Sequence, residues 1–284
     1  MDERRQHTDA FIPLDHVDEW KAETLKALRR TIDRRGFMRR GIHALAGATM
    51  GYTFLRMFSG RHVLAAPPKA AGKAVKANAV KTGTFFFPRL KFDILQGRAG
   101  WDVYPIADVN LRRQLRRLTN INASEDPVVV SLDDFESLRR YPFVFATDER
   151  HFKFSQKEER NLAEFLQRGG FIYGDDCVLG GTGVLFFKDF RKMMNKIYPD
   201  NPMRRVPDDH ELYHCYFDFP KGLPFLQGQD LGSWATFDRK TGRILTLLTP
   251  TDLHCGWTCW FFNEQLNLAS LKMGINIIVY YLSH

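Results

Sequence analysis

The chain has 284 residues, of which 44% are hydrophobic and 26% charged, a composition typical of a globular protein that can bury a sizeable core. Its net charge of +8 lies at one end: residues 1–83 hold 16 Lys and Arg against 8 Asp and Glu, whereas residues 84–284 hold 25 of each. A folded part without net charge has no bulk positive field to collect polyanions. Nucleic acid is therefore not among the expected partners.

The beginning of the chain has the pattern of an export signal. A twin-arginine motif is formed by Arg34, Arg35, Phe37 and Met38. An apolar stretch of mostly small residues follows at 41–58, and the small residues at 63–66 suit a signal peptidase. Basic segment, apolar segment and cleavage site occur in the order found in twin-arginine signal peptides.

This order defines three parts of the chain. We expect residues 1–65 to be a twin-arginine signal peptide with a long amino-terminal region, and residues 66–83, rich in Ala, Lys and Pro, to be a flexible spacer. Residues 84–284 form the folded domain. The protein is then expected in the periplasm or another extracytoplasmic compartment, with the twin-arginine translocase as a partner during export. The alternative is an uncleaved signal that anchors the protein in the membrane.

Residues 84–284 alternate between apolar runs typical of buried strands and amphipathic segments typical of helices. Strands are expected at 84–90, 127–132, 141–147, 171–174, 234–237 and 243–249. Helices are expected after Asp108 or Asn110, at 133–140, after a capping box formed by Ser155 and Glu158, and through 266–278 at the end. Strand–helix alternation with continuous apolar strands predicts an α/β fold, in which a mostly parallel sheet carries helices on both faces.

The strongest candidate for a site follows the run Phe171–Gly174. Asp175, Asp176 and Cys177 stand where this strand ends. Ligands of open α/β sheets bind at the carboxyl ends of the strands, so chemistry is expected here. The two carboxylates could bind a divalent cation through their oxygen atoms. They could equally cap the next helix or bond to loop amides.

The segment from His210 to His214 matches the zinc-protease pattern His-Glu-x-x-His, in which Glu211 would be the general base. That chemistry needs a stable helix, and Pro207 and Pro220 stand close on either side. We therefore favour His210 as a partner of the Asp175–Asp176 turn, either as a metal ligand or as a hydrogen-bonding group, over a metalloprotease. A purely structural histidine is the other interpretation.

A further candidate cluster follows the strand 243–249. Asp252, His254, Cys255 and Cys259 lie within eight residues. His254 could ligate zinc or iron together with Cys255 and Cys259. Asp252, His254 and His214 are also reserve ligands for a metal bound at Asp175, Asp176 and His210. The spacing is not one of the usual zinc patterns. The chain has four cysteines, at positions 177, 215, 255 and 259. After export they could instead form disulfides, for example between Cys177 and Cys215 or within the loop that holds Cys255 and Cys259.

The order of short motifs in residues 84–284 resembles a known family. The motifs are Phe85–Leu90, Gly100–Asp102, Asn110–Leu111, Tyr141–Phe143, Gly169–Asp176, Asp209–His210 and Gly274–Tyr280. They are similar in order and spacing to the domain-of-unknown-function 4159 family. The resemblance implies a flavodoxin-like fold of the class I glutamine amidotransferase type, in proteins that are often exported or membrane-tethered. It implies no established reaction.

The resemblance also bears on catalysis. Amidotransferases carry their cysteine nucleophile in a strained Gly-x-Cys-x-Gly turn after the strand. In the matching turn of this chain, Asp175 or Asp176 stands near the nucleophile position, and Cys177 follows one or two residues after it. We therefore expect a non-catalytic binding or assembly module of the cell envelope, with protein partners there. The alternative is a metal-dependent hydrolase that uses Asp175, Asp176 and His210.

Overall fold

The computed structural model describes residues 84–95, 100–178 and 184–284. The expected twin-arginine signal and the expected spacer lie outside these residues. Within the described part of the chain, no helix combines the length and the apolar character that a membrane span requires.

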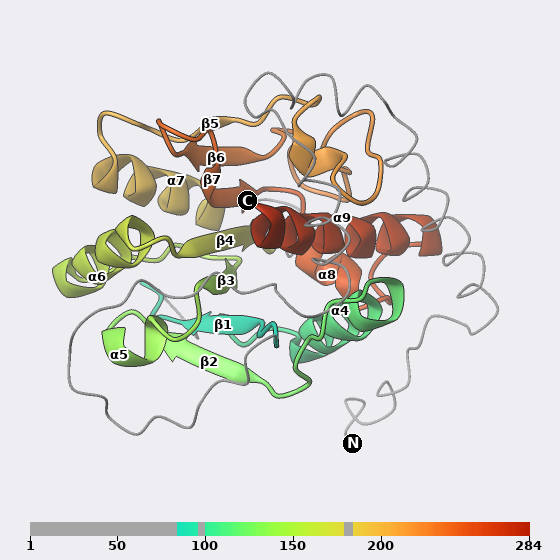
Figure 1. The fold of residues 1–284 in the computed structure, drawn as a ribbon, viewed down its shortest axis with the longest axis horizontal. Coiled ribbons are helices and arrows are strands. Elements are labelled where there is room, and N and C mark those ends of the chain that lie inside the picture. Colours follow the sequence, from blue (N-terminus) through green and yellow to red (C-terminus); the bar gives the residue numbers. More distant parts are fainter. Residues whose placement is uncertain (1–83, 96–99, 179–183) are drawn as a thin grey trace, which may run out of the picture.

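A seven-stranded sheet forms the centre of the domain (Figure 1). Its strands are β1 (Pro88–Lys91), β2 (Val128–Ser131), β3 (Phe143–Asp148), β4 (Phe171–Asp176), β5 (Arg204–Arg205), β6 (Trp234–Phe237) and β7 (Ile244–Thr249). They lie in the order β2-β1-β3-β4-β7-β6-β5. The first five positions pair in parallel, whereas β6 and β5 add an antiparallel edge. The strand order reverses between β1 and β3, and the crevice outside the carboxyl ends there is the usual ligand position of doubly wound sheets.

Helices cover both faces of this sheet. One layer holds α5 (Phe135–Leu138), α6 (Gln156–Gln167) and α7 (Leu185–Ile197), and the other holds α4 (Pro105–Leu118), α8 (Leu253–Trp257) and α9 (Glu264–Ser283) (Figure 1). A 3₁₀ turn, η2 (Glu211–Tyr213), precedes β6. The expected three-layer α/β/α fold with a mostly parallel sheet is thus confirmed. The narrower flavodoxin-like and amidotransferase-like assignments stay predictions.

Each face of the sheet has its own hydrophobic core. Alternate residues of a strand point to opposite faces, so Phe143 and Phe145 of β3 join the core beneath α4, α8 and α9, whereas Val144 and Ala146 join the core beneath α5, α6 and α7. The same alternation in β4 sends Tyr173 to the α8 side. Continued by two residues, it directs Asp175 toward α8 and Asp176 toward α7.

Local sequence signals explain several element boundaries. The capping box is present: the Ser155 hydroxyl accepts from the Glu158 backbone N–H, while the Glu158 carboxylate accepts from the Ser155 N–H. Two boundaries differ from expectation. Helix α4 begins at Pro105, before both expected caps, and β4 continues through both of its aspartates. The carboxylates therefore belong to the strand itself and share its hydrogen-bond register.

Candidate functional site

Four buried carboxylates meet at the carboxyl ends of three neighbouring strands. Asp148 ends β3, Asp175 and Asp176 end β4, and Asp252 follows β7; the side chains of all four are fully buried. The parallel register places Asp148 beside Asp176 and Asp175 beside Thr249. Asp175, Asp176 and the Asp252 loop therefore lie at the same edge of the sheet.

Asp175 is held on both of its oxygens. The hydroxyl of Thr249 donates to Oδ1, and the backbone N–H of His254 donates to Oδ2 over 2.8 Å. Burial, followed by the charge of Asp252, raises the pKa of Asp175 well above its usual range. Asp175 therefore ties β4 to β7 and to the start of α8.

Asp176 faces the other side of the sheet. Its Oδ2 accepts from the backbone N–H of Phe187 in the first turn of α7, at 2.7 Å. Its Oδ1 is buried and has no hydrogen-bond partner among the described residues. Burial raises the pKa of this carboxyl to about 7, although the bond from Phe187 acts in the opposite direction. Asp175 and Asp176 are adjacent in sequence but do not form one two-carboxylate site, since they serve opposite faces.

A second group at the same edge contains both sulfur and oxygen. The Sγ atoms of Cys177 and Cys255 are 3.6 Å apart, and Asp252 places a carboxylate oxygen so that all three ligand atoms lie within 4.8 Å of one another. Gln227 donates its amide to Asp252 Oδ2, whereas the buried Oδ1 has no partner in the described segments. Burial raises the pKa of Asp252. The mutual hydrogen bond and burial raise the pKa of Cys255, and burial raises that of Cys177 although its bond to Cys255 acts to lower it.

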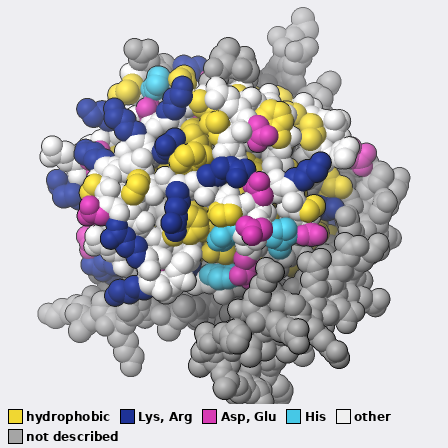
Figure 2. All heavy atoms as spheres, turned by 90° about the horizontal axis from the view of Figure 1, so that it is seen from above, with side chains coloured by type: hydrophobic (Ala, Val, Ile, Leu, Met, Phe, Trp, Pro, Cys, Tyr) yellow, Lys and Arg dark blue, Asp and Glu magenta, His cyan; other side chains and the backbone are white. Residues whose placement is uncertain are grey.

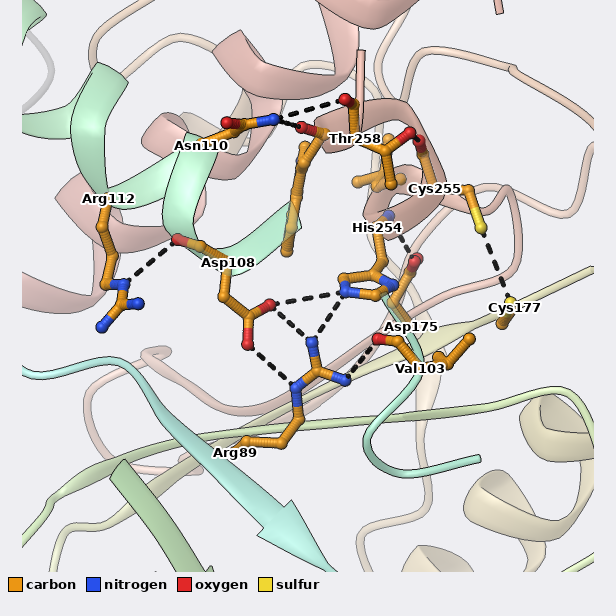
Figure 3. A network of polar contacts seen from close by, with 12 residues as sticks. Arg89, Val103, Asp108, Asn110, Arg112, Asp175, Cys177, His254, Cys255 and Thr258 are labelled. Carbon is orange, nitrogen blue, oxygen red and sulfur yellow. Dashed lines mark hydrogen bonds and ion pairs between the residues drawn. The ribbon is translucent and has the colours of Figure 1, made fainter. Parts of the chain in front are cut away.

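A buried ionic network lies beside this group (Figure 3). Arg89 of β1 donates from Nε and Nη2 to the two oxygens of Asp108 at 3.0 and 2.6 Å, and its Nη1 donates to the carbonyls of Trp101 and Val103. Burial alone would raise the pKa of Asp108, but the Arg89 guanidinium outweighs burial and lowers this pKa. Arg89 thereby connects β1, α4 and the loop between them.

His254 completes the network in its neutral form. Its Nε2 lies 2.8 Å from Nη2 of Arg89. A guanidinium can only donate, so Nε2 is the acceptor and the proton sits on Nδ1, which is buried and has no hydrogen-bond partner in the described part of the chain. Burial, then the charge of Arg89, lowers the pKa of His254 to about 4. His254 therefore lies at the expected edge of the sheet, but its ring is engaged in a hydrogen bond from Arg89.

His210 and His214 lie at the opposite edge. The His210 ring packs against Phe237 and Tyr280, and Phe237 pairs with Ile244 at the start of β7, whereas the carboxylates lie at its end. His210 therefore has no contact with Asp175 or Asp176, and the predicted partnership does not form. The stable helix that a zinc protease needs does not form over 210–214: the segment holds a 3₁₀ turn, in which His210 Nδ1 accepts the Leu212 N–H over 3.1 Å. Burial lowers the pKa of His210.

Histidines at this edge take part in surface ion pairs. Figure 2 shows histidine and acidic side chains side by side on one face of the molecule. His214 pairs with Asp218 at 2.5 Å, and His284 pairs with Glu211 at 3.2 Å. Glu211, the general base of the motif, is thus already engaged. The polar residues of the literal zinc-protease match are thus engaged within the fold: His210 is half-buried against two rings, and Glu211 and His214 form ion pairs.

The two remaining cysteines do not join the buried pair. Cys215 packs on α9, where its thiol donates to the carbonyl of Asn276 at 3.3 Å, so the expected bridge between Cys177 and Cys215 does not form. Cys259 follows α8, and its thiol contacts the Trp257 carbonyl. All four cysteines have free thiols.

An aromatic cluster is exposed near the buried acids. The Tyr104 ring meets the Phe261 ring edge-on with 4.9 Å between centroids, and the Trp260 ring at 6.5 Å. Trp260 and Phe261 are 39% and 43% exposed. Tyr104 precedes α4, and its pKa is raised by burial and next by the nearby thiol of Cys255. The cluster thus borders the edge of the sheet that holds the acids and thiols.

A family model covers most of the folded part of the chain. The model for the domain of unknown function DUF4159 matches residues 87–282. The chain belongs to this family. No curated protein matches the chain. The DUF4159 match covers every residue of the network and of the aromatic cluster but assigns a role to none of them.

Sequence reasoning missed three residues of this region as site residues: Arg89, Asp108 and Asp148. Asp148 accepts from the backbone N–H groups of Gly100, Glu149 and Arg150, and its pKa is raised by burial. A signal existed for Arg89, because a charge inside an apolar strand must be paired when it is buried. The sequence did not show which carboxylate would pair with it.

Proposed function

We propose that this protein is an exported binding or assembly module of the cell envelope that contacts a protein partner through the cluster formed by Tyr104, Trp260 and Phe261. One observation carries the proposal. Exposed aromatic rings border an edge of the sheet at which Asp175 and Asp176 are hydrogen-bonded into the fold and turned to opposite faces. Large aromatic side chains are enriched at protein interfaces relative to the rest of the surface.

The chemistry of the surface favours a protein partner with apolar side chains. Residues 84–284 have no net charge, so neither a polyanion nor an anionic lipid surface is attracted to the domain as a whole. Rings that already contact one another can bury apolar area on binding without losing much side-chain freedom. The alternative, a metal-dependent hydrolase built on Asp175, Asp176 and His210, lacks a comparable basis, since His210 lies at the other end of β7.

A photocrosslinking experiment in the native cell tests the interface. A photoreactive phenylalanine analogue replaces Phe261, and a matched analogue replaces Val129, which is 49% exposed on the edge strand β2. We expect a discrete protein adduct from position 261 only, and its loss in a Tyr104→Ala variant. Equal adducts from both positions, or an adduct with lipid alone, would overturn the proposal.

The export step is tested separately. Replacing Arg34 and Arg35 by Lys in the full chain should leave the protein in the cytoplasm, because the translocase reads the two guanidinium groups. Fractionation beside a Lys21→Arg control measures this. Unchanged export of the double variant would contradict the twin-arginine assignment and leave the interface to be judged by crosslinking.

A further inference from the structure

We propose that Cys177, Asp252 and Cys255 form a binding site for a zinc ion, with two thiolates and one carboxylate as protein ligands. The site goes beyond the binding role proposed above and does not depend on it. Three observations carry it: the spacing of the ligand atoms, an unpartnered buried oxygen and the way in which two strands bring the ligands together.

The sulfur atoms have the separation of two ligands on one zinc ion. With Zn–S bonds of about 2.3 Å and a tetrahedral angle, two bound thiolates lie about 3.8 Å apart. The observed distance is 3.6 Å. A disulfide would require about 2.05 Å. The pair therefore has the spacing of a dithiolate site, and an oxygen of Asp252 lies within 4.8 Å of both sulfurs.

The two carboxylate oxygens of Asp252 are placed as those of a metal ligand would be. Its Oδ2 is held by the amide of Gln227, and its Oδ1 is buried with no hydrogen-bond partner among the described residues. A buried carboxylate oxygen without a donor is costly, and a metal ion would satisfy it. An amide that holds one oxygen while the other remains available for coordination is a common outer-shell arrangement in metal sites.

The fold brings the three ligands together from two adjacent strands. Cys177 follows β4 directly, and its N–H continues the ladder by donating to the carbonyl of Asp148 over 3.0 Å. Asp252 and Cys255 lie in the loop and first turn of α8 after β7, the parallel neighbour of β4. All three side chains are buried, with at most 2% exposure. The three ligand residues are therefore brought together by the pairing of β4 with β7.

The ligand types select the class of metal. Thiolates favour Zn²⁺ and other borderline or soft ions over Ca²⁺ and Mg²⁺, which prefer oxygen ligands. Three protein ligands leave the fourth tetrahedral position for water or a bound molecule. This set differs from the candidate set built on Asp175, Asp176 and His210, of which none is a ligand here.

Zinc binding by the full chain, purified with its thiols reduced, tests the site. Competition with a chromophoric chelator should give one Zn²⁺ per chain. We expect Cys177→Ser and Cys255→Ser to weaken zinc binding at least 100-fold and Asp252→Asn about 10-fold or more. Cys215→Ser and Cys259→Ser are matched controls that should bind as the wild type does. Wild-type protein with Co²⁺ should show thiolate-to-metal charge-transfer absorption and the visible bands of a tetrahedral ion.

The cobalt spectrum is independent of whether a variant folds, since it needs no substitution. Absence of zinc uptake by the fully reduced protein would overturn the proposal. So would zinc binding that the Cys255→Ser variant retains, or a Co²⁺ complex without thiolate charge-transfer absorption.

Discussion

The two ends of strand β7 differ in how the fold positions the polar residues that lie there. At its beginning, the His-Glu-x-x-His segment matches a known metal motif letter by letter, yet its side chains form surface ion pairs and a 3₁₀ cap. At its end, Asp252 and Cys255 match no usual motif, yet they meet Cys177 across 78 residues of chain in a buried cluster. A motif needs its helix to place its ligands, whereas the parallel neighbours β4 and β7 bring together the residues that follow their carboxyl ends.

The largest effect should come from Arg89→Leu, in the buried network that includes His254 beyond the end of β7. This substitution leaves the Asp108 carboxylate buried without its guanidinium, and removing one partner of a buried pair costs about 3–5 kcal/mol. Urea unfolding measures the change. Arg139→Leu, which breaks an exposed pair with Glu136, should cost less than about 1 kcal/mol. The double variant Arg89→Leu with Asp108→Leu should recover part of the loss, and equal losses in single and double variants would contradict the pairing.

Asp175→Ala should cause the next largest loss of stability. It removes the acceptor for the Thr249 hydroxyl and the His254 backbone N–H, and each buried donor left unpaired costs about 1–3 kcal/mol. The comparison at the other end of β7 is Asp218→Ala, whose carboxylate is 43% exposed and pairs with His214, so its cost should stay below about 1 kcal/mol. Thermal unfolding of both variants in the same buffer measures the two losses of stability. A cost for Asp218→Ala equal to that for Asp175→Ala would mean that the two ends do not differ.

His210→Ala should have a small effect on stability and none on metal binding. The substitution removes His210 Nδ1, which caps the 3₁₀ turn by accepting the Leu212 N–H, and loss of such a cap costs about 1 kcal/mol. Zinc stoichiometry, measured beside Asp252→Asn, should be unchanged because His210 lies at the other end of β7. Loss of zinc from the His210→Ala protein would place the metal at the motif instead.

The smallest predicted effect is the pH dependence of His284→Gln. Its bond to Glu211 and the charge of that residue outweigh burial and raise the pKa of His284. A base with a raised pKa stabilises the fold fully below its unfolded pKa of about 6.5, and this contribution disappears as the pH rises through the folded value. His284→Gln should therefore cost up to about 1 kcal/mol at pH 5.5 and nothing at pH 9. A larger cost at pH 9 would reverse the sign and contradict the pair.

The elements of the fold could be predicted because their signals are local. The capping box at Ser155 and Glu158 and the apolar run at 141–147 depend only on neighbouring residues, and both are present in the structure. The candidate edge followed from one rule on parallel sheets. The ligand partners did not follow, since pairing Cys177 with Cys255, or Arg89 with Asp108, requires the strand order, which depends on contacts distant in the chain.

Strand order also decides when the cluster can exist. Strand β7 lies between β4 and β6, although β5 and β6 precede it along the chain. Cys177 acquires its two neighbours only after this last strand has inserted, so a growing or partly folded chain offers no assembled ligand set. Ion capture would then be a late event that reports complete folding. For a chain translocated after folding, the metal supply of the cytoplasm, rather than that of its destination, would determine which ion it carries.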